Sequence, residues 1–258
     1  MNRNKAARVT GGVILLVALV VTLAARATVV SGIAGWWLFN DGSGITALDS
    51  SDLGNNGTLQ GSAFFTTDPQ RGAVLNVYGP SGEVDFPFTT TLEPAIGTIT
   101  VWVKPTLAQT ADIVRQTTDL LVRSNASGTF YAYCLRVSSK GNPVAIIAND
   151  DPKTNGKYPQ IVVQGPAGVK LNQWAHLAMR WDGSTLSLFL NGKLAGSSPY
   201  SATPNLGLSY HGTAPMKVAA AIWDFNNGYL EYQGNLSDLR MYSRALTDTE
   251  IYNISVGK

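Results

Sequence analysis

The chain has 258 residues, of which 45% are apolar and only 14% are charged, with 26 glycines and 12 prolines. A chain of this length can bury a core, which excludes disorder and a disulfide-stabilised miniprotein. The composition is typical of an all-β protein rich in turns. The whole chain has a net charge of +2. Four of the 19 Lys and Arg residues and none of the 17 acids precede Asp41, so the part of the chain beyond residue 40 has a net charge of −2. A nucleic-acid partner is therefore not expected. The single cysteine, Cys134, excludes an internal disulfide and a multi-cysteine metal site.

The N-terminal segment contains an uncharged apolar run over residues 9–25, bracketed by Arg8 and Arg26. As a helix this run spans about 25 Å, and snorkelling arginines make crossing a bilayer feasible. We expect residues 1–31 to be a cytoplasmic N-terminus and a transmembrane anchor, with the following domain on the periplasmic or extracellular side of the inner (cytoplasmic) membrane. The alternative is a cleaved signal peptide, because residues 25–27 read Ala-Arg-Ala, as an A-x-A cleavage site does.

Small residues mark one stripe of this predicted helix. Ala18, Thr22 and Ala25 are spaced by four and three residues, which lets a second helix approach closely. The predicted partner is therefore an integral membrane protein complex. Trp36 follows soon after, either as a contact with the membrane or partner or as part of the first strand of the next domain.

Residues 32–258 are predicted to form one β-domain, because short β-rich runs alternate with Gly, Pro, Asn and Asp turns. Two dipeptides, Asn191-Gly192 and Asp182-Gly183, predict type I′ hairpins. Thr247 with Glu250 has the spacing of a capping box and predicts one helical turn. The strands are expected at residues 35–39, 74–77, 98–103, 120–123, 130–137, 144–148, 160–163, 174–181, 185–190, 217–221 and 236–241.

Four stretches carry a family resemblance: WWLFNDGSG at 36–44, ITVWVKP at 99–105, WAHLA at 174–178 with LFLNG at 188–192, and GNLSDLRMYSRAL at 234–246. In this order they resemble the laminin-G-like, concanavalin A-like lectin family. The resemblance implies an all-β antiparallel jelly-roll sandwich over residues 32–258, with its first and last strands side by side. It also implies a binding role, although this fold hosts many functions.

Catalytic residues are not expected, so the chain is predicted not to be an enzyme. Glycosidases need paired carboxylates facing one cleft, and the nearest match, Glu83-Val84-Asp85, lacks a third acid and reads as a strand-end turn. His176 is expected to be a buried structural histidine with satisfied hydrogen bonds, and His211 a solvated loop residue. No Ser–His–Asp or Cys–His set can be assembled from so few histidines.

A structural calcium ion is the one metal that the resemblance implies, and no other cofactor is expected. Asp49 matches an early Asp of the relatives and Asp238 lies in the closing motif, whereas Ser237 stands where relatives often carry Asp. Calcium needs about six to eight oxygen ligands, so these two acids would supply only part of the site.

A candidate ligand loop combines aromatic and amide side chains in Trp223, Asn226 and Tyr229, which suits sugar binding, although Trp223 could instead cap the core. Two functions follow. The first is a non-catalytic, membrane-anchored structural or accessory subunit that packs on a membrane complex through its helix and its jelly-roll domain. The alternative is a glycan-binding, lectin-like surface or secreted module.

Overall fold

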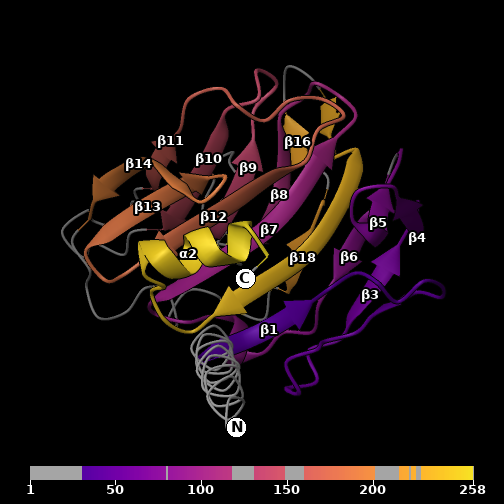
Figure 1. The fold of residues 1–258 in the computed structure, drawn as a ribbon, viewed down its shortest axis with the longest axis horizontal. Helices are drawn as coiled ribbons and strands as arrows, with labels where there is room; N and C mark the ends of the chain where they lie inside the picture. The colour runs from indigo at the N-terminus through magenta and orange to yellow at the C-terminus, as the bar shows by residue number, and fades with distance from the viewer. Residues whose placement is uncertain are drawn as a thin grey trace, which may run out of the picture.

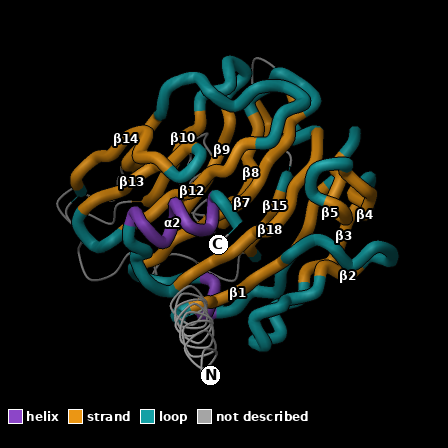
Figure 2. Tube along the Cα trace, in the orientation of Figure 1, coloured by secondary structure: helices purple, strands orange, loops and turns teal. Residues whose placement is uncertain are grey.

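Two antiparallel β-sheets stacked face to face, with a short helix on the outside of one of them, make up the fold (Figures 1 and 2). The structure is a computed structural model that describes residues 31–79, 81–117, 131–148, 160–200, 215–220, 222–224 and 228–257. All strand pairs in this part of the chain are antiparallel, so the all-β sandwich is confirmed. The predicted anchor at residues 9–25 lies outside the described residues, and none of the described helices has the length and apolar character needed to cross a membrane.

Sheet A is the eight-stranded layer that carries the helix. Its hydrogen-bonded order is β14-β13-β12-β7-β18-β5-β4, and β1 also pairs with β18. Its strands are β1 (Ile33–Trp37), β4 (Ala63–Asp68), β5 (Gly72–Val77), β7 (Gly97–Pro105), β12 (Ala175–Trp181), β13 (Thr185–Leu190), β14 (Lys193–Pro199) and β18 (Gly234–Tyr242).

Sheet B is the second eight-stranded layer, in the order β11-β10-β9-β8-β15-β6-β3-β2. Its strands are β2 (Thr46–Ala47), β3 (Gly57–Gln60), β6 (Glu83–Asp85), β8 (Ala111–Thr117), β9 (Tyr131–Val137), β10 (Pro143–Ala148), β11 (Gln160–Gln164) and β15 (Met216–Val218). Outside both sheets lie the hairpin β16 (Ile222–Asp224) and β17 (Gly228–Leu230), the 3-10 turn η1 (Thr90–Leu92) and the helix α2 (Asp248–Ser255).

The core lies between the sheets, because every second side chain of each strand points inward. On β12 the inward residues include Leu177 and Met179, which pack with residues such as Ile113 and Leu135 of sheet B in one buried cluster. The alternate residues of β12, His176 among them, belong to the outer face. The apolar residues at every second position of β12 therefore lie on its inward face.

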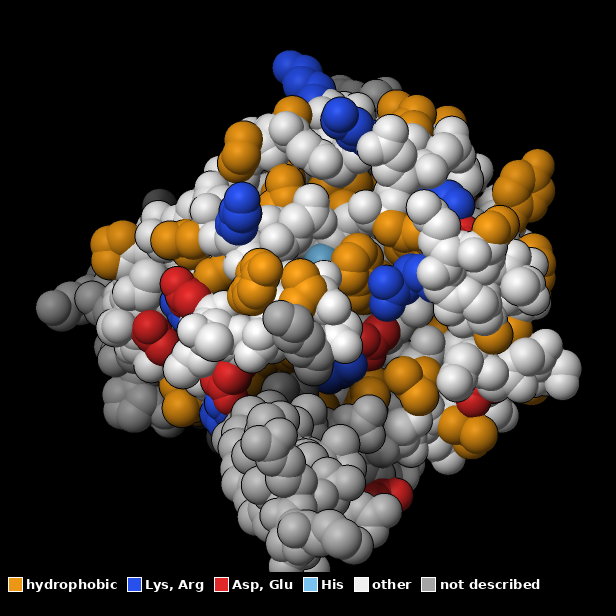
Figure 3. Space-filling model, viewed as in Figure 1, with side chains coloured by type: hydrophobic (Ala, Val, Ile, Leu, Met, Phe, Trp, Pro, Cys, Tyr) orange, Lys and Arg blue, Asp and Glu red, His pale blue; other side chains and the backbone are white. Residues whose placement is uncertain are grey.

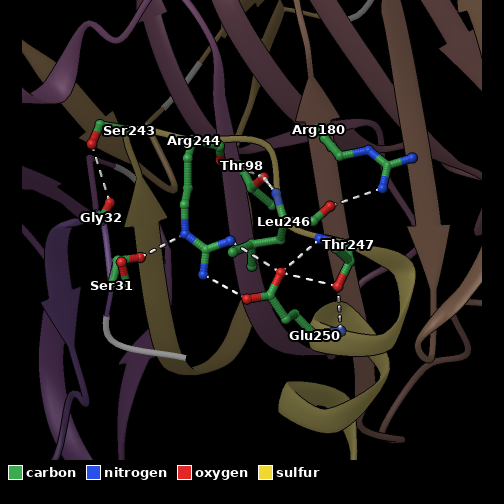
Figure 4. A network of polar contacts seen from close by, with 9 residues as sticks. All are labelled: Ser31, Gly32, Thr98, Arg180, Ser243, Arg244, Leu246, Thr247 and Glu250. Atoms are coloured by element: carbon green, nitrogen blue, oxygen red, sulfur yellow. Dashed lines mark hydrogen bonds and ion pairs between the residues drawn. The ribbon is translucent and has the colours of Figure 1, made fainter. Parts of the chain in front are cut away.

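The first and last strands lie side by side, as the family resemblance implied. β1 pairs with β18, with Trp36 opposite Arg240. Just outside these strands, Arg244 Nε donates a hydrogen bond to the carbonyl of Ser31 at 2.7 Å (Figure 4). The chain thus enters the sandwich at a point that is tied to the segment leading into α2.

The helix α2 begins with the predicted capping box. Thr247 Oγ1 accepts a hydrogen bond from the Glu250 amide at 3.2 Å, and Glu250 Oε2 accepts one from the Thr247 amide at 2.8 Å (Figure 4). Arg244 holds the same carboxylate through an ion pair of 2.6 Å. The helix packs on the outer face of sheet A, where Ile251 and Ile254 are buried.

The turn predictions had different outcomes. Asn191 and Gly192 both adopt positive φ, 51° and 74°, and join β13 to β14, as a type I′ hairpin requires. The hairpin predicted at Asp182-Gly183 does join β12 to β13, but its turn is not of type I′. Asp182 does not have a positive φ, the loop runs through Ser184, and Asp182 Oδ1 accepts the amides of Ser184 and Thr185. An Asp side chain can replace the backbone partner in a turn of this kind.

Most predicted strands are present, whereas several strands without a clear apolar pattern were missed. The β8 strand was missed because Asp112 and Arg115 interrupt its apolar run; the two side chains form an ion pair of 3.3 Å. Glu83 and Asp85 were read as part of a turn, but they form the strand β6. The predicted strand at residues 120–123 lies outside the described residues.

Candidate functional site on the outer face of sheet A

The outer face of sheet A is divided into two parts. One end is covered by α2, which buries Ala178, Phe189 and Tyr242 together with its own isoleucines. Beside the helix, the surface over β7 and β18 gathers hydrophobic and basic side chains (Figure 3). We call this second part the outer-face cluster; its residues are Asp68, Arg71, Trp102, Lys104, Trp174, Asn235 and His176.

Arg71 lies at the centre of the cluster, on the turn between β4 and β5. Its guanidinium carbon is 4.1 Å from the ring centre of Trp102 and 5.4 Å from that of Trp174. Both tryptophans are partly exposed. A cation over an indole face is attracted by the negative face of the ring, so the arginine and the two indoles hold one another in place.

Asp68, at the end of β4, connects three strands. It accepts hydrogen bonds from Lys104 Nζ at 2.7 Å and Trp174 Nε1 at 2.9 Å, and Asn235 Nδ2 lies at 3.4 Å. Burial alone would raise the pKa of this carboxyl, but the hydrogen bonds from Lys104 and Trp174 hold the pKa well below its usual range. Asp68 is therefore ionised and its oxygens are engaged inside the cluster.

Next to this cluster, Trp36 links the two acids that were predicted to bind calcium. Its indole Nε1 donates to Asp238 Oδ1 at 2.7 Å, and its backbone amide donates to Asp49 Oδ1 at 3.0 Å. Arg240 lies over the Trp36 ring at 4.5 Å. Trp36 thus belongs to the surface of sheet A, which is the strand alternative of the sequence analysis, and nothing in the described residues tests its contact with a membrane or a partner.

Hydrogen bonds occupy the two predicted calcium ligands. Asp49 also accepts the amides of Ser51 and Asn55, both at 2.9 Å. Asp238 forms a two-point ion pair with Arg240, whose Nε and Nη2 lie at 2.7 and 2.8 Å. A guanidinium in this position repels a divalent cation, and the described residues contain no group of three or more His, Cys, Asp or Glu side chains that could hold a metal. In this structure the two acids organise the backbone and Trp36, and the calcium site stays a prediction.

A β-bulge explains how Asp238 reaches both partners. The pairing of β18 with β7 shifts between Ser237 and Arg240, and Asp238 has a positive φ of 51°. Bulges commonly re-aim a side chain out of the regular alternation. The bulge brings the Asp238 carboxylate to Arg240, two residues further along the same strand, and to Trp36 on β1.

His176 on β12 is fully buried, but it is not hydrogen-bonded through its ring as expected. Both Nδ1 and Nε2 lack a partner, and only its backbone amide is bound, donating to Asn191 Oδ1 at 2.9 Å. Its ring packs against Trp102, with 5.3 Å between ring centres. Burial lowers the pKa of His176 to about 3, so the imidazole is neutral at pH 7.

The outer face of sheet B carries charges that are closely paired. Lys217 Nζ lies 2.6 Å from Glu83 Oε1 and 2.7 Å from Asp85 Oδ1. Asp112 is buried and pairs with Arg136 at 2.6 Å. The Cys134 thiol is buried, as expected, and burial raises its pKa well above the usual value.

A cleft of about 170 Å³ opens at one end of the sandwich, between the end of β7 and the turn after β9. Lys140 is the one charged residue among those that line it, and none is an acid or a histidine. The cleft therefore lacks groups for acid–base chemistry at neutral pH.

The remaining predicted contact residues belong to the predicted N-terminal helix and to the candidate ligand loop. Ala18, Thr22, Ala25 and Asn226 lie outside the described residues. Trp223 and Tyr229 are opposite each other in the hairpin β16–β17, so the predicted loop is in part a two-stranded ribbon. The outer-face cluster was missed by sequence reasoning because it joins residues 68–71, 102–104, 174 and 235, which no local pattern connects.

The fold and this surface define a class: an antiparallel sandwich whose acids are paired and whose outer face carries aromatic and basic side chains. A family model described as the concanavalin A-like lectin/glucanases superfamily, Laminin_G_3, matches residues 78–252. The chain belongs to this family. The expected laminin-G-like and concanavalin A-like character is therefore confirmed.

Individual relatives are distant. Human usherin is 23% identical over 161 residues, which are 62% of this chain and 3% of usherin. The binding domain of Paraclostridial Mosquitocidal Protein 1 has a TM-score of 0.61 at 14% identity, over 88% of this chain and 52% of that chain. Domain 4 of AbnA, a GH43 extracellular arabinanase from Geobacillus stearothermophilus solved with arabinotriose, has a TM-score of 0.53 at 16% identity, over 86% and 98% of the two chains. The chain thus spans a small part of usherin and about half of the mosquitocidal binding domain, and these structural likenesses show the fold alone.

Proposed function

We propose that the chain is a non-catalytic binding module that contacts its ligand through the uncovered part of the outer face of sheet A. The observation that carries this proposal is the outer-face cluster, in which two partly exposed indoles flank the Arg71 guanidinium. Ligand sites typically combine such aromatic surfaces with a few polar groups of fixed position. Family membership supports a binding role, and the arabinanase domain solved with arabinotriose supports a glycan as the ligand.

The paired acids support the absence of catalysis. A glycosidase needs one carboxyl group that stays protonated at working pH while a second one is ionised. Glu83 and Asp85 both form ion pairs with the Lys217 ammonium, so neither is an unpaired carboxyl group of the kind that a general acid needs. Asp112 is held in the same way by Arg136.

A glycan panel tests the binding function. The full chain in detergent is applied to immobilised saccharides, and we expect retention on at least one class and no release of hydrolysis products. The double variant Trp102→Ala with Trp174→Ala is expected to lose this retention, whereas the control Tyr78→Ala, which removes a 68% exposed tyrosine away from the cluster, keeps it. Retention that survives the double variant, no retention at all, or turnover of any glycoside would refute the proposal.

The membrane anchor is part of the same proposal. Residues 9–25 would hold the module on the outer side of the inner membrane, and the tie from Arg244 to Ser31 would fix the sandwich close to the point where the chain leaves the bilayer. From Arg26 to Ile33 there are seven residues, which reach about 25 Å when extended. A module so close to the bilayer is suited to packing on a membrane protein complex as an accessory subunit.

Co-purification tests the anchor as a docking element. The double variant Ala18→Leu with Thr22→Leu enlarges the small-residue stripe, so the protein should stay in the membrane fraction and stop co-purifying with its partner complex. The control Leu15→Ala with Leu19→Ala changes the bulkier face of the helix and should leave co-purification unchanged. If the first variant still co-purifies with the complex, the helix stripe is not the attachment.

A further inference from the structure

Arg71 is the cation of the outer-face cluster that has no acid of its own. Its Nε is buried without a hydrogen-bond partner, and no ion pair of this residue occurs within the described part of the chain. Burial lowers the pKa of Arg71 even though Asp238 and Asp68 lie near enough to oppose this effect. An arginine nevertheless stays charged at neutral pH, so the guanidinium is a charged group with unused donors.

The two nearby acids already form ion pairs with other cations. Asp68 pairs with Lys104 at 2.7 Å, and Asp238 pairs with Arg240 at 2.7 Å. Each of these pairs is neutral overall, which leaves the charge of Arg71 uncompensated. A partly desolvated, unpaired cation costs free energy, and an anionic ligand would remove that cost.

His176 is a second unsatisfied group at the same place. It is fully buried, both ring nitrogens lack a partner, and its ring touches the Trp102 ring that Arg71 covers. A neutral imidazole offers one N–H donor and one acceptor nitrogen. This capacity is unused within the described part of the chain, next to the Trp102 ring.

We propose that Arg71 binds the carboxylate of an acidic saccharide, such as a uronic acid, whose sugar ring packs beside the guanidinium against the partly exposed indole of Trp174. The planar guanidinium matches a carboxylate with two parallel hydrogen bonds, and a sugar brings hydroxyl groups for the partly exposed Asn235 amide. A carboxylate on a peptide backbone would use the arginine but not the indole surface of Trp174. This inference rests on the proposed binding function and names its ligand class.

The test compares two ligands of the same size. The full chain in detergent is titrated with a galacturonate trisaccharide and with the neutral galactose trisaccharide of the same linkage, and binding is followed by tryptophan fluorescence and by calorimetry. We expect the acidic trisaccharide alone to bind measurably, and its affinity to fall as salt is raised. Arg71→Met should weaken binding about tenfold or more, as expected for loss of a charged hydrogen-bonded pair.

Two further variants separate charge from geometry. Arg71→Lys keeps the charge but loses the two-point fit, so it should recover only part of the affinity. The control Lys193→Met removes an exposed cation on β14 and should leave binding unchanged. The salt dependence of the unmodified protein is an independent readout if an Arg71 variant fails to fold.

The outcomes are distinct. Equal binding of the neutral and acidic trisaccharides, or acidic binding that Arg71→Met leaves intact, overturns this inference while the binding module stands. Equal or tighter binding of a triglutamate peptide with the same dependence on Arg71 overturns the saccharide as ligand. No binding of any saccharide on the panel refutes the proposed function itself.

Discussion

His176 shows how one residue can be placed correctly and still behave differently from expectation. The sequence predicted a buried histidine on β12, which is confirmed, but its ring nitrogens have no partners. Asp238 and Arg240 of β18 and Arg71 of the β4–β5 turn are the charged groups that act on it, and burial is the largest cause of its low pKa. The folded protein therefore resists protonation of this ring.

That resistance predicts a loss of stability in mild acid. The pKa is about 3 in the folded state and 6.5 in the unfolded chain, so the unfolded state takes up the proton first and stability falls as the pH drops below 6.5. Between pH 7 and pH 5 the contribution of this one group should fall by about 2 kcal/mol. Urea unfolding of the protein and of His176→Phe at both pH values measures it.

The comparison needs both proteins, because the free energy of unfolding of the unmodified protein also contains the pH dependence of its other ionisable groups. The His176→Phe variant should lose less free energy of unfolding between the two pH values than the unmodified protein does. Equal losses in the two proteins would show that His176 is not held neutral.

At the scale of single elements, α2 illustrates a local signal that is complete in the sequence. Thr247 and Glu250 satisfy each other's backbone amides, and Arg244 holds the Glu250 carboxylate. The Arg244 hydrogen bond lowers the pKa of Glu250 most strongly. All three residues lie within one turn or its approach, so their spacing alone was sufficient to predict the cap.

Removal of the cap should weaken the whole domain. Thr247→Ala deletes the side-chain acceptor for the Glu250 amide and should lower the free energy of unfolding by about 1 kcal/mol. The matched control is Thr249→Ala, two residues along the same helix and exposed, which should be neutral or slightly stabilising because alanine favours helix. Equal effects of the two substitutions in denaturant unfolding would argue against the cap.

The β18 bulge is the opposite case among the elements. The segment was correctly predicted as a strand from its β-rich run, but the register shift at Ser237 and the positive φ of Asp238 were not. Asp has no strong preference that signals a bulge, and the shift depends on how β7 and β1 pair on either side. The direction in which the Asp238 side chain points is therefore set by how the strands pair in the sheet, and not by the sequence of β18 alone.

At the scale of the whole molecule, the core is contained within the sandwich. The large buried cluster begins at Ala34 and joins both sheets, so its described members do not require the N-terminal segment. Deleting residues 1–30 should leave a folded, soluble, monomeric β-protein that keeps the Ser31 contact with Arg244. Denaturant unfolding followed by tryptophan fluorescence checks this.

The expected result is one cooperative transition. As a control, the same deletion with Trp37→Ala should unfold at much lower denaturant, because Trp37 is fully buried and donates to the Asn55 carbonyl at 2.8 Å. A truncated chain without any cooperative transition would place part of the folding unit before residue 31.

The sequence by itself determined the fold class, most strands of the sandwich, the Asn191-Gly192 hairpin and the cap of α2. These features depend on β-rich runs along the strands, on turn residues and on the spacing of the capping residues, all of which act over a few residues. Only the tertiary structure decided the site. Arg71, Trp102 and Trp174 come from three separate segments, and their pairing depends on the strand order of sheet A. Likewise, whether the carboxylates of Asp49 and Asp238 bind a metal or accept hydrogen bonds from Trp36 depends on which groups the fold brings to their oxygens. No local sequence pattern predicts which of these groups will lie there.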